Sequence, residues 1–391
     1  MNIYLRIYDY GQRYEMDIVG QGEVHERIPI SVTEKYLRQI NTRLKEPTAL
    51  LMYHAAIGGD LAREEWETDL VGMARAGQSV FTDIFGESGA QETMKNHLAA
   101  ADRIIIEVNS EHFFVPWELL YSEDLTKKPS LENFWGMKYV IYHLINQRKR
   151  PADRRATTTI NVDSKPRFGL FTFKDARLPN IGAREIPFFN DLDKDGKIAL
   201  RKLPRLDPTV NKKETELHRF KQFLKQSRHV VHFACHALSN EKDPLKSFIQ
   251  LSDGIQISLA DLSQAPTALM KGFPLVVLNA CSTGRLSPMN VRYFAGNFIQ
   301  YGALGVVATE ANVPDNLAAD FTQKLYPHLL NGEYLGDSVL RTRQELWEQG
   351  NPVGLLYALY GSPIIRLAIG KSAGNEKRPR RNSSPVTVLK K

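Results

Sequence analysis

The sequence predicts an α/β fold with a mostly parallel sheet, because short apolar segments alternate with amphipathic helical ones. Three apolar segments, at 229–235, 275–278 and 303–308, are rich in valine or alanine and short enough to be buried strands. Parallel strands require long crossover connections, and helices in those connections cover both faces of the sheet. The chain between the three segments is long enough for such crossovers.

The first 147 residues predict a smaller α/β unit. Alternating apolar residues indicate a strand over 1–8, and Ile104, Ile105, Ile106 and Val108 indicate a short buried strand. The spacing of apolar residues predicts helices near 33–44 and 89–100. A segment rich in aromatic residues, 113–120, follows the second strand.

The second piece has a more regular pattern. It begins with a predicted strand over 168–173 and a helix around 217–224, and the three apolar segments follow. One further helix is predicted from near Asp315, and another over 337–349. Asp337 is a suitable N-cap for this last helix, and Gly350 stands where a C-terminal glycine is preferred.

Two polar segments divide the chain. Between 148 and 165, basic residues, prolines and small polar residues stand without helical periodicity, which predicts an exposed linker. From 370 onward the sequence is rich in Lys, Arg, Asn, Ser and Pro and holds too little apolar surface to fold. We therefore expect an N-terminal region over 1–147, a basic linker over 148–165, a main domain over 166–369 and a disordered basic tail over 370–391.

Composition and charge exclude several classes of protein. The 391 residues include only 2 cysteines, too few for a disulfide framework or a four-thiolate zinc site. No apolar run is long enough for a transmembrane helix, and the N-terminus lacks the pattern of a secretory signal, so we expect a cytoplasmic protein without membrane insertion. Seven basic residues and one acidic residue lie within 370–391, so the net charge of +7 suggests nucleic acid binding only weakly.

No metal or cofactor site is predicted. Residues 191–198 resemble the start of a calcium-binding EF-hand loop, but Lys202 stands where the bidentate carboxylate belongs, so an acidic surface loop is preferred over a weak calcium site. His232 and His236 are four residues apart, as in a helical zinc motif. The glutamate of that motif is replaced by Phe233, and the surrounding valines favour a strand. The sequence also lacks a glycine-rich phosphate-binding loop.

His236 and Cys281 stand at the ends of two predicted strands. In an open α/β sheet, ligands bind beyond the carboxyl ends of the strands, so adjacent parallel strands would bring both residues to one edge. A thiol becomes a strong nucleophile as the thiolate, and a neighbouring imidazole can take its proton and later protonate a leaving amine. The sequence therefore predicts a Cys-His dyad, with Gly284 allowing a sharp turn after the thiol.

Simpler interpretations exist for each residue taken alone. A cysteine at a strand end is most often a small buried apolar residue, and a single histidine most often belongs to the core or the surface. We assign the packing role to Cys235, which alternation places on the opposite face from His236, and we expect His232 to be buried and hydrogen-bonded. The combination of His236 with Cys281, 45 residues later, favours catalysis.

Four blocks of sequence resemble the CHAT family, caspase-like cysteine peptidases of the caspase–separase clan that are common in bacteria. His232-Phe-Ala-Cys-His236-Ala and Leu278-Asn-Ala-Cys281-Ser-Thr-Gly resemble its two catalytic blocks. Pro116-Trp-Glu-Leu-Leu resembles an upstream block, and Leu359-Tyr-Gly-Ser-Pro-Ile-Ile-Arg-Leu resembles the closing block. The histidine precedes the cysteine, as in caspases, whereas papain-like enzymes have the opposite order.

The resemblance implies a caspase–haemoglobinase sandwich whose N-terminal half is a degenerate relative of the catalytic half. It makes His236 the general base and acid, Cys281 the nucleophile, and the N–H groups of Ala237 and Cys281 the oxyanion donors. Ala237 replaces the usual glycine but keeps its N–H, so this role survives unless the position needs a positive φ.

The resemblance also places part of the substrate pocket in the segment after the next strand. Glu310 or Asp315 in that pocket would favour a basic substrate residue through charge pairing. Asp315 has an alternative role as the N-cap of the next helix, and an apolar pocket is a further alternative.

A regulated endopeptidase that cleaves specific protein partners is the function that the resemblance implies, in antiviral defence or programmed cell death. Gasdermin-like pore formers or a dedicated partner would be the substrate, and an activator or sensor protein would release the activity. Self-cleavage in the basic segment 148–155 is another route to activation, although a solvated linker is the simpler interpretation. The competing hypotheses are a non-catalytic scaffold, which the retention of His236 and Cys281 argues against, and a nucleic-acid-binding protein anchored by its tail.

Overall fold

A computed structural model describes most of the chain. The described residues are 2–9, 14–20, 23–30, 32, 34–58, 60–86, 88–109, 115–145, 158–173, 178–203, 213–238, 240, 243–252, 255–263, 269–282 and 288–370. The basic segment 148–155, Gly284 and the expected tail beyond Gly370 lie outside these residues.

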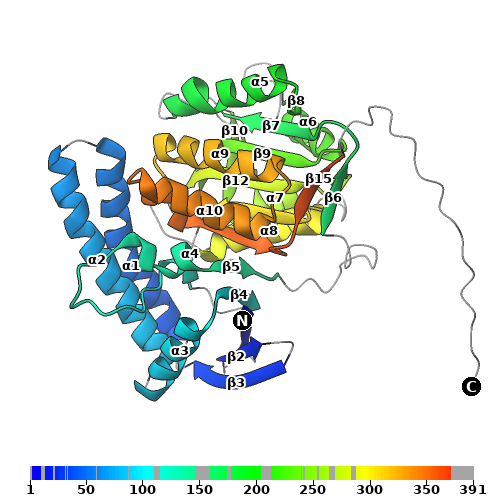
Figure 1. Cartoon of the computed structure of the whole chain (residues 1–391). Helices are drawn as coiled ribbons and strands as arrows, with labels where there is room; N and C mark the ends of the chain where they lie inside the picture. Colours follow the sequence, from blue (N-terminus) through cyan, green and yellow to red (C-terminus); the bar gives the residue numbers. More distant parts are fainter. Residues whose placement is uncertain are drawn as a thin grey trace, which may run out of the picture.

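One large sheet runs through the molecule (Figure 1). Its strands are, in spatial order, β11 (Ile255–Ser258), β10 (Phe248–Ser252), β9 (Val230–Leu238), β12 (Leu275–Ser282), β13 (Gly305–Thr309), β14 (Tyr357–Gly361), β5 (Val140–His143), β4 (Arg103–Asn109), β1 (Asn2–Asp9), β2 (Tyr14–Gly20) and β3 (Glu23–Ile30). Two more strands branch from this row: β7 (Arg167–Thr172) pairs with β9, and β8 (Ala199–Lys202) pairs with β7. Strands β8, β7, β9, β12 and β13 are parallel neighbours, and so are β14, β5, β4 and β1. The expected mostly parallel sheet is therefore confirmed.

Helices cover both faces of this sheet. They are α1 (Glu34–Ile57), α2 (Asp60–Phe85), α3 (Ser88–Ala100), α4 (Trp135–Lys138), α5 (Ile186–Lys194), α6 (Lys213–Lys225), α7 (Leu259–Ser263), α8 (Pro288–Tyr301), α9 (Asp315–Leu330) and α10 (Leu335–Glu348), with short helical turns η1 (Trp117–Leu119), η2 (Leu131–Asn133), η4 (Ile181–Glu185), η5 (Pro244–Lys246) and η6 (Pro352–Leu356). Buried side chains of α5, α9 and α10 belong to one apolar core, and those of α6, α7 and α8 to a second core. Residues of β9 alternate between the two cores, as a strand buried on both faces requires.

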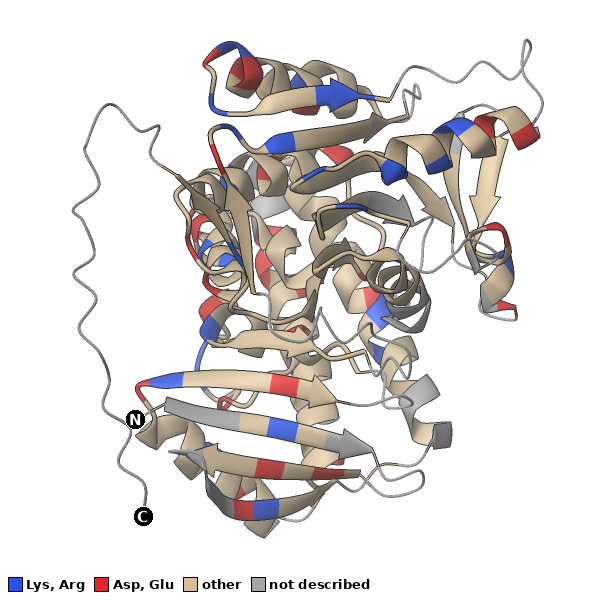
Figure 2. Ribbon diagram, turned by 90° about the vertical axis from the view of Figure 1, so that its right-hand side faces the viewer, with Lys and Arg blue, Asp and Glu red and all other residues tan. Residues whose placement is uncertain are grey.

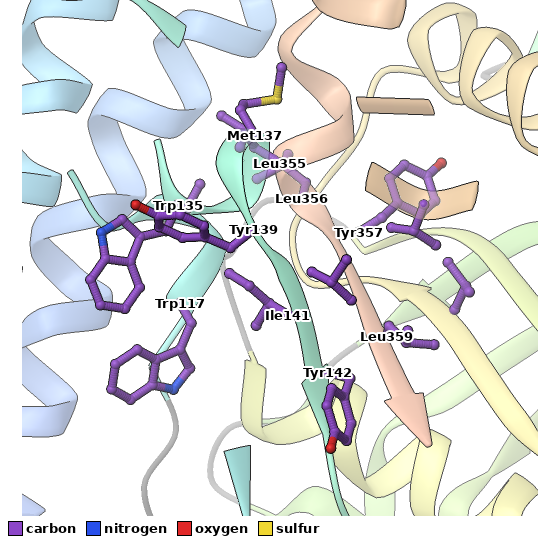
Figure 3. Close-up of a cluster of buried hydrophobic side chains, with 14 of the residues drawn as sticks. Trp117, Trp135, Met137, Tyr139, Ile141, Tyr142, Leu355, Leu356, Tyr357 and Leu359 are labelled. Carbon is purple, nitrogen blue, oxygen red and sulfur yellow. The ribbon is translucent and has the colours of Figure 1, made fainter. Parts of the chain in front are cut away.

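The N-terminal region and the main domain share one core. Strand β5 of the first region pairs with β14 of the second, where His143 stands opposite Tyr360. Figure 3 shows Trp117, Trp135 and Ile141 on one side of this junction and aliphatic side chains of η6 and β14 on the other. The division into two regions stays a prediction, and the sheet continues without a break across it.

Part of the segment expected to be a linker forms strand β6 (Thr159–Val162). It pairs in parallel with β15 (Arg366–Ile369) in a separate two-stranded sheet, where Ile160 and Val162 are buried. The exposed linker therefore does not extend over these residues. Two apolar side chains in four residues are too short a pattern to predict a strand, and the partner strand lies at the far end of the chain.

The start of α10 differs from the sequence-based expectation, whereas its end agrees with it. Tyr334, not Asp337, occupies the N-cap position of α10, and Asp337 lies in the first turn with its Oδ1 2.5 Å from Nη2 of Arg103. The expected terminating glycine is confirmed, because Gly350 adopts a φ of 71° just past this helix. The acidic segment 191–198 begins as the last turn of α5, and Gly196 has a φ of 72° in the turn that follows.

Candidate active site

Parallel pairing of β9 with β12 brings His236 and Cys281 together. The register runs without interruption from Val230 opposite Leu275 to Ala237 opposite Ser282, and it places Cys281 directly opposite His236. Both residues lie near the carboxyl ends of adjacent parallel strands, which is the edge where ligands bind in open α/β sheets. The backbone therefore places His236 and Cys281 on adjacent parallel strands, as the sequence predicted.

His236 lies at the edge of the apolar core. Its side chain is 8% exposed, and its ring meets the edge of Phe173 with 5.9 Å between ring centroids. Ala237, the next residue, pairs with Ser282 of β12 on one side and with Ile249 of β10 on the other. The catalytic roles of His236 and Cys281 and the oxyanion roles of the Ala237 and Cys281 N–H groups stay predictions.

A buried polar network surrounds the residues that precede this pair on β9 and β12. Asn279 is two residues before Cys281 and is buried, and its Nδ2 donates to the carboxylate of Glu185 and lies 3.1 Å from Oγ1 of Thr322. The hydroxyl of Tyr357 donates to Oδ1 of Asn279 at 2.6 Å. These contacts fix both ends of the amide, so the strand that carries Cys281 is tied to η4, α9 and β14.

His232 belongs to the same network from the neighbouring strand. It is fully buried, with Nδ1 2.8 Å from the Tyr326 hydroxyl and Nε2 3.5 Å from Oε2 of Glu185. Burial, together with the nearby Glu185, raises the pKa of Tyr326 well above its ordinary value, so this hydroxyl stays protonated. The prediction that His232 is buried and hydrogen-bonded is confirmed, as is the packing of Cys235 in the core of the opposite face.

Sequence reasoning missed Glu185 and Asn279 as members of this site. A buried asparagine in an otherwise apolar strand was a usable signal, because buried amides require partners. Glu185 carries no such sequence signal, because it lies 94 positions from Asn279 and outside any recognised motif. Contacts at such separations leave no local periodicity in the sequence.

The two acidic residues expected in the substrate pocket have partners within the protein. Glu310 is 4% exposed and accepts a hydrogen bond of 2.9 Å from the Tyr360 hydroxyl. Burial, and next the nearby Glu118, raise the pKa of Glu310 well above its ordinary value. Asp315 accepts hydrogen bonds from the backbone N and Nδ2 of Asn180 at 2.7 and 3.0 Å. The N-cap position of α9 belongs to Pro314, so Asp315 is not the cap, and substrate binding by either carboxyl stays a prediction.

A buried ion pair joins helix α10 to the turn η1. Arg343 of α10 and Glu118 of η1 are each 1% exposed, with 3.3 Å between Nη2 and Oε1. The same guanidinium donates to the backbone carbonyls of Gly136, Gly354 and Tyr357 at 2.9, 3.1 and 2.5 Å. Burial would raise the pKa of Glu118, but His143 and Arg343 outweigh it and hold that pKa below its ordinary value. Glu118 is the charged residue of the upstream Pro-Trp-Glu-Leu-Leu block.

Replacement of Asn279 tests the network beneath the dyad. Asn279→Leu is expected to lower the free energy of unfolding by about 2–4 kcal/mol, because it leaves the buried Glu185 carboxylate without its amide donor. Urea denaturation monitored by circular dichroism measures the change. The control is Asn190→Leu on the exposed side of α5, which is expected to stay within about 0.5 kcal/mol of the parent chain. Equal effects of the two substitutions would contradict a role for the network.

The described residues hold neither a candidate metal site nor a membrane span. Among them, no group of three or more His, Cys, Asp or Glu side chains is arranged to hold a metal ion. No described helix is both long and apolar enough to cross a membrane.

Solved structures with a similar fold include separase. Two crystal structures of the Saccharomyces cerevisiae separase–securin complex match 93% and 94% of this chain at 11% and 10% identity, with TM-scores of 0.53 and 0.54. The chain spans about 30% of the length of the separase chain. The Porphyromonas gingivalis protease RgpB, in complex with its pro-domain, matches 72% of the chain at 10% identity with a TM-score of 0.48.

The separase likeness shows the fold, and the expected caspase–haemoglobinase-like α/β sandwich with a mostly parallel sheet is confirmed. A search of proteins with curated functions finds no match. The sequence profile of the CHAT domain matches residues 81–379, which include β5, the strands that carry His236 and Cys281, and the buried ion pair. This chain belongs to the CHAT domain family.

Proposed function

We propose that this protein is a cysteine endopeptidase in which His236 and Cys281 form the catalytic dyad. The observation that carries the proposal is the parallel register of β9 and β12, which places these two residues opposite each other at the carboxyl edge of the sheet. Membership of the CHAT family and the separase-like fold give independent support. The network of Asn279, Glu185 and His232 fixes both strands beneath the pair and supplies the rigid base that such chemistry needs.

The proposed chemistry uses the imidazole in both directions. His236 takes the proton of the Cys281 thiol, and the thiolate attacks the scissile carbonyl carbon to form a tetrahedral oxyanion. The N–H groups of Ala237 and Cys281 stabilise that oxyanion, and the protonated imidazole then gives its proton to the leaving amine. A water molecule, deprotonated by His236, hydrolyses the thioester and restores the thiol.

Protein partners are the proposed substrates. One similar structure is that of a separase in complex with securin, and it supports recognition of a protein by this fold. We infer that the protein works in the cytoplasm and that an activator or sensor protein controls it. A place in antiviral defence or programmed cell death, with a gasdermin-like or dedicated substrate, follows from the family resemblance.

Cleavage by paired wild-type and Cys281→Ala chains tests the proposed function. Proteins encoded beside this one are mixed with each chain, and mass spectrometry identifies new peptide ends. We expect cuts with the wild type that are absent with Cys281→Ala, because the alanine has no nucleophile. If the same cuts occur with both chains, or if Cys281→Ala retains the full biological effect, the fold serves as a non-catalytic scaffold instead.

A further inference from the structure

Two guanidinium groups converge on a single carbonyl at the amino end of β9. Nη1 of Arg228 lies 3.3 Å from the backbone oxygen of Ser227, and Nε of Arg167 lies 3.2 Å from the same oxygen. Nη2 of Arg167 also lies 3.1 Å from Oγ of Ser227. Two cations therefore share one neutral acceptor, an arrangement that leaves their positive charges uncompensated.

A third arginine stands on the same face of the sheet. Arg201 of β8 stands opposite Gly169 of β7, and Gly169 stands opposite Val231 of β9. Val231 belongs to the core beneath α6, so Arg201 lies on the α6 side of the sheet. Arg228 lies over Gly169, because a Cβ built there would be 3.4 Å from its Nε. Figure 2 shows blue segments on the two uppermost strands, β8 and β7, which carry Arg201 and Arg167. We call Arg167, Arg201 and Arg228 the arginine cluster.

Arg228 is the buried member of the arginine cluster. It is 7% exposed, its Nη2 donates to Oε1 of Gln226, and its guanidinium lies 5.6 Å from the ring of Phe223. Its Nε is buried without a hydrogen-bond partner among the described residues. A charged side chain nine-tenths buried normally has an oppositely charged partner. Across the described ranges, none of the three arginines has an ion pair with a carboxylate.

The surroundings are electrostatically positive. Burial, and then the charges of Arg201 and Arg167, lower the pKa of Arg228. Burial and the charge of Arg167 lower the pKa of the adjacent His229 to about 4, against an opposing effect of Asp163. Nδ1 of His229 accepts the backbone N–H of Arg167 at 2.9 Å, so the ring is neutral at pH 7 and supplies no negative charge.

We propose that the arginine cluster is a binding site for a phosphate group, separate from the dyad. Guanidinium groups present N–H forks that match the oxygens of phosphate, and a doubly charged anion compensates several cations better than a single carboxylate does. The exposed guanidinium groups of Arg167 and Arg201 supply donors for such an anion, and the uncompensated charge of the buried Arg228 beside them adds to its attraction. Glycine at position 169 lets Phe223 and Arg228 pack directly on β7, because a Cβ there would lie 2.9 Å from Cζ of Phe223 and 3.4 Å from Nε of Arg228.

The site lies at the opposite end of β9 from His236. Arg228 is eight residues before His236, which corresponds to roughly 26 Å along a strand. A phosphate bound there cannot contact the dyad, but it holds the amino ends of β7 and β9 together. The proposal therefore does not rest on peptidase activity, and its test measures binding.

Calorimetric titration of the full chain with inorganic phosphate tests this site. Each titration is repeated with acetate at the same ionic strength and pH 7. We expect saturable phosphate binding with a dissociation constant of about 1 mM or below and no comparable acetate binding. Arg201→Gln is expected to weaken phosphate binding at least about tenfold, because it removes one charge-assisted donor. The matched control is Arg341→Gln on α10, which is 60% exposed and is expected to bind phosphate as the wild type does.

Thermal unfolding of the same variants separates binding from folding. Without phosphate, Arg201→Gln is expected to unfold at a temperature equal to or above that of the wild type, because the repulsion within the cluster is reduced. Phosphate is expected to raise the unfolding temperature of the wild type and not that of Arg201→Gln. The titration is also made with a nucleoside monophosphate in place of inorganic phosphate. The ligand with the lower dissociation constant shows whether the site prefers a phosphate ester or the free ion. The proposal is overturned if the wild type binds phosphate no better than acetate, or if Arg201→Gln binds it unchanged.

Discussion

Replacing His236 by Asn is expected to lower the rate of peptide cleavage by about 10²–10⁴-fold, because the substitution removes the group that takes and returns the proton. The loss is expected to be accompanied by slower alkylation of Cys281 by iodoacetamide. An imidazole beside a thiol lowers the thiol pKa below its ordinary value of about 8.5, so we expect the wild type to react as a thiolate even near pH 6. In His236→Asn we expect alkylation near pH 6 to be about tenfold slower or more.

The chain is well suited to this measurement because it has only 2 cysteines and Cys235 is fully buried. Intact-mass spectrometry of the folded protein therefore counts the reaction at Cys281 alone. The control is His218→Asn, since His218 lies exposed on α6 and is expected to leave both cleavage and alkylation unchanged. The difference in alkylation should vanish above about pH 9, where an unassisted thiol is also ionised. Equal alkylation rates near pH 6 in wild type and His236→Asn would remove the case for the dyad.

Replacing Arg343 by Met is expected to lower the free energy of unfolding by about 3–5 kcal/mol, which is the usual effect of removing one partner of a buried ion pair. The guanidinium of Arg343 contacts Glu118 and three backbone carbonyls, and both charged side chains are 1% exposed. Its loss leaves the Glu118 carboxylate buried beside Glu310, whose own pKa is already raised. The midpoint of urea denaturation reports the change.

Two further variants show whether the charge is the cause. Arg343→Met combined with Glu118→Gln is expected to lose less stability than Arg343→Met alone, because the second change removes the uncompensated carboxylate. Arg341→Met, two residues earlier on α10, loses only an exposed pair with Glu333 at 3.2 Å and is expected to change stability by less than about 1 kcal/mol. If the double variant is less stable than the single one, packing and not charge explains the effect of Arg343.

Much of the fold could be predicted from the sequence because its signals are local. Strands β1, β4, β7, β9, β12 and β13 are short apolar segments, and each lies where the pattern placed it. Helix α2 escaped prediction even though Leu70, Met73 and Val80 are buried at helical spacing. Gly77 weakens that pattern, and the structure shows why glycine stands there: a Cβ would lie 2.3 Å from the Leu119 carbonyl.

The sequence by itself determined the candidate dyad and the parallel α/β sheet that carries it. Both follow from residue type, strand alternation and the length of the connection between two apolar segments, which are all readable along the chain. Only the tertiary structure decided the residues around it: Glu185 and Asn279 beneath the dyad, Glu118 with Arg343 behind it, and the arginine cluster at the other end of β9. These groups come from segments far apart in the sequence. The packing of strands and helices distant in sequence brings them together, and such packing leaves no periodic signal in the chain.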